Sequence, residues 1–189
     1  MTLDTAAIIA ETRAWVDRAV IGLNLCPFAK AVQVKGQIRY VVCPTSEPAE
    51  LLNTLCDELH RLAESDPQDV DTTLLIHPAA LTDFLDFNDF LAVADAAVEE
   101  HGYAGILQVA SFHPQFQFAD THINDVSNAT NRAPFPTLHL LRESSIDRAV
   151  AAFPEAETIF EANIETLENL GAEGWAALQA QCRKDAQRT

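Results

Sequence analysis

The stretch Gln37-Ile-Arg-Tyr-Val-Val-Cys43, the leucine-rich segment after it and Thr72-Thr-Leu-Leu-Ile76 together decide the fold. The first run is rich in β-branched residues and ends before Pro44, which predicts a strand. The last run is short, apolar and bounded by polar residues, which predicts a buried strand. Between them, leucines recur at helical spacing on one face: Leu51, Leu52, Leu55, Leu59 and Leu62. A strand, a helix and a strand in this order predict a sheet with a helix packed on it.

The same alternation extends to both sides of this unit. Apolar residues between Ile8 and Leu23 follow the 3.6-residue period of a helix, as do those from Phe84 to Val98, and residues 105–112 read as a third strand. After Phe112 the alternation stops, and the chain from Pro136 onward is predicted to be helical. We therefore expect an α+β fold: a single domain over residues 1–189, with a small three- or four-stranded sheet packed with helices and a helical C-terminal third.

Charge and composition narrow the classes of partner. The net charge is −16, and residues 62–131 contain no Lys or Arg. Nucleic acids and anionic membranes are bound by clustered basic residues, so neither is expected as a partner. No apolar stretch approaches the roughly 20 residues of a membrane helix, and the N-terminus lacks the pattern of a signal peptide. The four cysteines form no C-x-x-C pair, and we expect a soluble cytoplasmic protein; no oligomeric state is assigned.

One long segment, residues 111–140, has the composition of a functional site. It holds three of the six histidines, His113, His122 and His139, and shows little helical or strand periodicity. Long connections without periodicity are usually functional or disordered, and the aromatic residues here argue against disorder. His113 and His139 flank the segment, which makes them the best candidates for proton transfer or ligation.

A second segment, residues 21–30, places Cys26 before Pro27 and so at a bend. A cysteine at a bend can expose its sulfur to a pocket, and a nearby base or cation such as Lys30, Arg132 or a histidine would make it a nucleophile. The alternative is that Cys26 is a small buried hydrophobic residue, as free cysteines often are. We predict a catalytic group of Cys26, His113 and His139.

Amides and guanidinium groups near both segments suggest a polar or anionic ligand. Arg132 is the first basic residue after a long acidic stretch, and its fork suits a carboxylate or phosphate. The alternative is an ion pair between Arg132 and one of the carboxylates. The predicted substrate-binding residues are Asn24, Lys30, Asn128, Asn131, Arg132 and Arg142.

The sequence assigns no cofactor and no metal ligand. The dinucleotide fingerprint G-x-G-x-x-G and the P-loop are both absent, which disfavours a Rossmann-type nucleotide site. The histidines lack the spacing of known zinc motifs, although Cys26, His113, His122 and His139 would together form a ligand set.

Three motifs resemble those of the domain of unknown function 1415 family of bacterial and plastid proteins. They are Gly22-Leu-Asn-Leu-Cys-Pro-Phe-Ala29, Ser111-Phe-His-Pro114 and Asn131-Arg-Ala-Pro-Phe-Pro-Thr-Leu-His-Leu-Leu-Arg-Glu143. The resemblance covers nearly the whole chain and implies a single-domain soluble protein. The family has no assigned reaction, so the resemblance implies no catalytic residues.

The residues favour a small cysteine- and histidine-dependent enzyme, a transferase or hydrolase acting on a small polar or anionic substrate. A competing hypothesis is a noncatalytic protein that binds a metal or a small ligand in the same pocket. The third hypothesis is a metal-dependent enzyme that uses Cys26 and histidines as ligands.

Overall fold

The centre of the molecule is a mixed sheet of four strands. The computed structural model describes residues 4–153 and 155–188. The strands β1 (Ile38–Val42), β2 (Thr72–Ile76), β4 (Thr137–Arg142) and β3 (Leu107–Phe112) lie side by side in that order. β1 and β2 are parallel, whereas β4 runs antiparallel to both of its neighbours. The expected α+β fold with a small sheet is confirmed.

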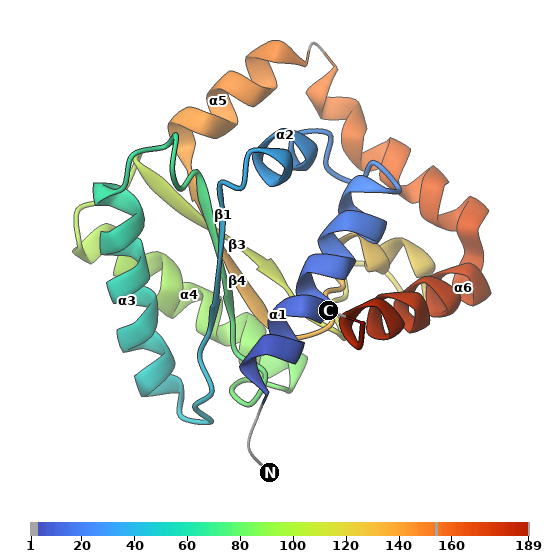
Figure 1. Cartoon of the computed structure of the whole chain (residues 1–189), viewed down its shortest axis with the longest axis horizontal. Coiled ribbons are helices and arrows are strands. Elements are labelled where there is room, and N and C mark those ends of the chain that lie inside the picture. The colour runs from blue at the N-terminus through green and yellow to red at the C-terminus, as the bar shows by residue number, and fades with distance from the viewer. Residues whose placement is uncertain (1–3, 154, 189) are drawn as a thin grey trace.

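One face of the sheet is covered by the helices α3 (Pro48–Glu64) and α4 (Phe84–Glu100), as Figure 1 shows. The predicted leucine face of α3 packs here, and Leu51, Leu55 and Leu59 are fully buried. Leu138 and Leu140 of β4 point into the same core because alternate residues of a strand face the same side. Residues of α3, α4 and β4 therefore share one buried core on this face of the sheet.

The opposite face is covered by α1 (Thr5–Trp15), which continues as the π-helical segment η1 (Val16–Ile21), and by α6 (Ile159–Ala186). Trp15 and Trp175 belong to this second core. Gly22 follows η1, and a Cβ atom there would lie 2.2 Å from the carbonyl oxygen of Arg18. The close turn at the end of this helix therefore requires glycine.

The remaining elements close the same side of the sheet. They are the short helix α2 (Ala29–Val34), the 3-10 helices η2 (Val126–Asn131) and η3 (Ala156–Thr158), and α5 (Glu143–Ala152). In Figure 1, α5 extends from the sheet across to the side of α6. None of the residues of α5 is buried. The C-terminal third after β4 is helical, as predicted.

The prediction of a helix from Pro136 is wrong, because residues 137–142 form the strand β4. β4 lies between β2 and β3 and hydrogen bonds to both. Its burial alternates, with Leu138 and Leu140 buried and His139 and Leu141 partly buried, but its sequence Thr-Leu-His-Leu-Leu-Arg does not alternate clearly between polar and apolar residues. Its pairing with two strands distant in sequence, rather than local propensity, determines its conformation.

Candidate functional site

A cavity of about 330 Å³ lies against the face of the sheet opposite α3 and α4. We call it the sheet cavity. β1, β2, β3 and β4 form its floor, and α1, η1, α2 and α5 form its walls. Its apolar lining is Trp15, Val16, Val20, Phe28, Ala29, Val32, Ile38, Leu74, Phe112, Leu141, Ile146 and Ala149, and its polar lining is Cys26, Asp71, Thr72, Gln108, His139 and Ser145. The sheet cavity is therefore a mostly apolar chamber with a few polar groups.

Cys26 lines the sheet cavity from the bend between η1 and α2. The bend is fixed from outside, because Asn163 of α6 donates its side-chain N–H to the carbonyl oxygen of Leu25 at 2.9 Å. Burial raises the pKa of the Cys26 thiol, and hydrogen bonds from the backbone N–H groups of Phe28 and Ala29 offset part of this effect. At neutral pH the sulfur is therefore a thiol rather than a thiolate.

His139 lies on the floor of the sheet cavity, in the central strand β4. Its Nε2 lies 2.7 Å from the hydroxyl oxygen of Thr72, which lies 2.6 Å from the carbonyl oxygen of Leu140. The ring of Phe112 packs beside it at 5.8 Å between centroids. Burial lowers the pKa of His139 to about 4, so the ring is neutral at neutral pH.

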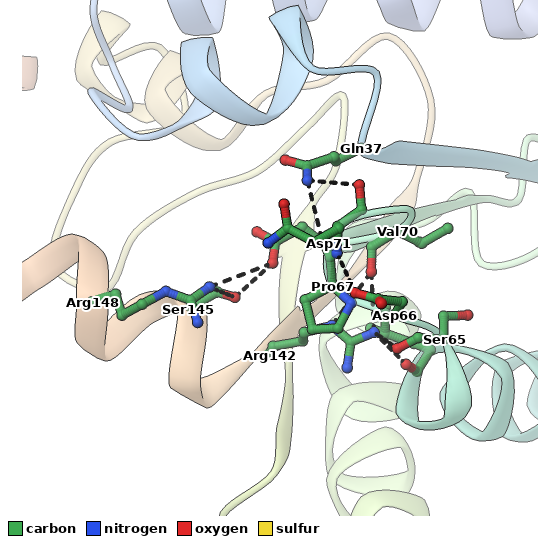
Figure 2. A network of polar contacts seen from close by, with 11 residues as sticks. Gln37, Ser65, Asp66, Pro67, Val70, Asp71, Arg142, Ser145 and Arg148 are labelled. Atoms are coloured by element: carbon green, nitrogen blue, oxygen red, sulfur yellow. Dashed lines mark hydrogen bonds and ion pairs between the residues drawn. The ribbon is translucent and has the colours of Figure 1, made fainter.

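At one end of the sheet cavity, Asp71 and Ser145 connect β2 to α5. The Ser145 hydroxyl donates to Asp71 Oδ1 at 2.6 Å and accepts from Arg148 at 2.9 Å. Figure 2 shows this short chain of polar contacts. The same two residues, with Phe28, Val32 and Ala149, also line an outer groove of about 670 Å³. The Asp71 and Ser145 contact therefore lies between the sheet cavity and the protein surface.

His113 does not line the sheet cavity. It is fully buried on the side of α4, where its ring packs against Phe84 and Phe87. Its Nε2 lies 3.2 Å from the carbonyl oxygen of Leu81, and its Nδ1 accepts the backbone N–H of Gln115 at 3.1 Å. Both ring nitrogens are therefore occupied by backbone groups, and the structure does not bring His113 together with Cys26 and His139.

Asn128, Asn131 and Arg132 support the long segment from within. The Asn128 side chain binds the backbone of Phe118 and His122, and Asn131 donates to the carbonyl oxygen of Ser111 at 3.2 Å. Arg132 donates to the carbonyl oxygens of Phe116 at 3.0 Å and Ile123 at 2.7 Å. None of the three lines the sheet cavity.

The other predicted ligand-binding residues also lie outside the sheet cavity. Arg142 is buried and donates to the carbonyl oxygen of Leu62. It also donates to the carbonyl oxygens of Ser65 and Val70, as Figure 2 shows. Asn24 and Lys30 are exposed. Of the predicted residues, the structure places Cys26 and His139 around one cavity and the others elsewhere.

The proposed ligand set of Cys26, His113, His122 and His139 does not form a cluster. Within residues 4–153 and 155–188, no three His, Cys, Asp or Glu side chains are placed to hold one metal ion. His122 is exposed, and His113 is buried on the opposite side of the sheet from the sheet cavity. No helix in this described part of the chain is both long enough and apolar enough to span a membrane.

Sequence reasoning missed Thr72, Asp71, Ser145 and Phe28 as residues of the cavity. Thr72 carried a signal, because a hydroxyl in an otherwise apolar buried strand needs a partner. Phe28 carried none, since its role depends on where the bend after η1 lies relative to the sheet.

A family model described as "Protein of unknown function (DUF1415)" matches residues 7–177. The chain belongs to this family. No curated protein matches the chain, and no solved structure does. Cys26, Thr72 and His139 of this DUF1415 member all lie within the matched range. The description of the family names no reaction, and the sheet cavity is the feature of this structure that bears on function.

Proposed function

We propose that this protein binds a small, uncharged and mostly apolar molecule in the sheet cavity. The observation that carries the proposal is the cavity itself, about 330 Å³ and mostly apolar, with a few polar groups on its floor and at one end. Sites for small molecules typically enclose about 300–1,000 Å³ and combine an apolar lining with a few polar groups. The noncatalytic alternative from the sequence is the one that this geometry supports best.

The charges around the cavity argue against an anionic ligand. Asp71 is the one charged side chain among the described residues that line it, and its carboxylate already binds Ser145 and faces Arg148. The guanidinium groups of Arg132 and Arg142 are occupied by backbone carbonyls elsewhere. An anion placed in the sheet cavity would lose its hydration without gaining a partner of opposite charge.

Binding is tested with N-phenyl-1-naphthylamine, an uncharged dye whose fluorescence rises in apolar surroundings. We expect saturable binding to the wild type at one dye per chain. Ala149→Phe fills the cavity from α5 and should weaken binding about tenfold or more. Val150→Phe is the control, because Val150 is exposed on the same helix and does not line the cavity. Absence of saturation, or equal weakening by both variants, would refute the proposal.

A thiol-dependent reaction on the bound molecule is the second candidate, favoured by Cys26 and His139 lining one cavity. It is separated from simple binding by the alkylation rate of each cysteine from pH 6 to 9, followed by peptide mass. For binding alone, we expect slow modification of Cys26 at pH 7 and further slowing by the dye. Cys56 of α3, which does not line the cavity, is the internal control. A Cys26 rate that reaches its plateau below the ordinary thiol pKa of about 8.5 would favour catalysis.

A further inference from the structure

The proton positions around Thr72 can be assigned from chemistry alone. The Thr72 hydroxyl has one hydrogen and lies 2.6 Å from the Leu140 carbonyl oxygen, which can only accept. Thr72 therefore donates to Leu140. The same hydroxyl lies 2.7 Å from Nε2 of His139, so this contact has Nε2–H as its donor. A neutral imidazole carries one N–H, which leaves Nδ1 as an acceptor.

Nδ1 of His139 lacks a partner in the described part of the protein. Its ring makes a single hydrogen bond there, through Nε2. The buried polar side-chain atoms without a partner are found on Trp15, Thr73 and His77, and Nδ1 of His139 is not among them. Nδ1 is therefore accessible, on a residue that lines the sheet cavity. It is an unpaired acceptor beside mostly apolar walls.

Resting on the proposed function, we infer that the ligand donates a hydrogen bond from an uncharged hydroxyl or N–H group to Nδ1 of His139. A ligand without a donor would desolvate this nitrogen and leave it unpaired, which costs binding free energy. A charged donor such as an ammonium would lose hydration among apolar side chains, and Asp71 is already bound by Ser145. The site therefore selects an uncharged donor on an apolar body.

A pair of probes of equal shape tests this selection. 2-Naphthol and 2-methylnaphthalene differ by a hydroxyl in place of a methyl group, and each competes with N-phenyl-1-naphthylamine. His139→Phe keeps a ring on the floor of the cavity and removes both nitrogens. In His139→Phe, we expect the dissociation constant of 2-naphthol, divided by that of 2-methylnaphthalene, to rise about tenfold. This is the effect expected from the loss of one hydrogen bond.

Thr72 supplies a second variant that keeps the histidine. Thr72→Val removes the hydroxyl at nearly constant volume, so Nε2–H loses its acceptor and the ring can present a donor to the cavity. 2-Methoxynaphthalene accepts but cannot donate, and we expect it to gain affinity several-fold in Thr72→Val. Thr72→Ser retains the hydroxyl and should keep the wild-type order of the three probes. Urea unfolding of each variant verifies that it is folded.

These measurements distinguish a failure of the inference about His139 from a failure of the proposed binding function. If none of the naphthalenes or the dye binds the wild type, the proposed function fails and the inference fails with it. If they bind but the ratio for 2-naphthol and 2-methylnaphthalene is the same in wild type and His139→Phe, only the inference fails. A gain for 2-methoxynaphthalene in Thr72→Ser equal to that in Thr72→Val would also contradict the assigned proton positions.

Discussion

Asn128 shows how single side chains hold the long segment in place. Its Oδ1 accepts from the Phe118 N–H and the Thr121 hydroxyl, both at 2.9 Å, and its Nδ2 donates to the His122 carbonyl at 2.8 Å. It is fully buried, so water cannot replace these bonds. We predict that Asn128→Ala lowers the free energy of unfolding by about 2–4 kcal/mol, because the Phe118 N–H and the His122 carbonyl oxygen lose their partner. The Thr121 hydroxyl keeps the Phe118 carbonyl oxygen, 2.8 Å away, as its acceptor.

Urea unfolding measures this effect, with Thr121→Val as the matched comparison. That variant removes the hydroxyl, which lies close to both Asn128 Oδ1 and the Phe118 carbonyl oxygen, and keeps the two bonds between Asn128 and the backbone. It should cost about 1 kcal/mol. A loss in Asn128→Ala no larger than that in Thr121→Val would show that the three bonds do not support the segment together.

At the scale of the element, Arg142 fixes the C-terminal end of α3 to β4. It binds the carbonyl oxygens of Leu62 in α3, Ser65 just after it and Val70 before β2. The last carbonyls of a helix have no partner within the helix, and a guanidinium can reach several of them. We predict that Arg142→Met destabilises the protein by about 2–4 kcal/mol in urea unfolding. Arg148→Met is the control, because Arg148 is mostly exposed, and it should change stability by less than about 1 kcal/mol.

The helix α5 covers one side of the sheet cavity. None of its residues is buried, and Ser145 ties it to Asp71 beside β2. We predict that Ser145→Ala increases amide hydrogen exchange in α5 several-fold and leaves α3 and α4 unchanged, since helices with few buried contacts open locally. Ser144→Ala is the control, because Ser144 is exposed and its side chain makes no hydrogen bond within the described residues. Equal exchange in both variants would show that the Asp71 contact does not hold α5.

For the molecule as a whole, buried neutral histidines make stability depend on pH. Burial lowers the pKa of His77 to about 4, and His77 is fully buried with Nε2 unpaired. In the unfolded chain a histidine binds its proton near pH 6.5, so the unfolded state gains protons first as the pH falls. The free energy of unfolding is therefore not reduced by His77 above about pH 6.5. Between pH 6.5 and pH 4 it falls progressively, by about 3 kcal/mol for His77.

The free energy of unfolding from pH 7.5 to 4.5 measures this loss. His77→Asn keeps a donor for the Ala80 carbonyl oxygen and removes the titrating ring, so the slope below pH 6.5 should flatten. His101→Asn, at the exposed end of α4, should leave the slope as in the wild type. An unchanged slope in His77→Asn would show that other groups cause the acid sensitivity.

Local sequence patterns were sufficient to predict most of the helices and strands of the molecule. The leucine face of α3, the apolar run of β2 and the helical period of α4 are repeated over enough residues to predict conformation. The strand β4 was not predicted, because its conformation depends on pairing with β2 and β3, which are distant in the chain. The residue types in the long segment pointed equally to His139, which lines the sheet cavity, and to His113, which does not.

The sequence by itself determined the α+β fold, the acidic character of the chain and the membership of its family, because these depend on periodicity, charge and motif. Only the tertiary structure decided which polar residues share a cavity. His139 faces it because strand residues alternate and the leucines on either side of it are needed by the other core. Arg132 and Arg142 are turned away from it by backbone carbonyls, partners that every residue carries and that no sequence pattern reveals.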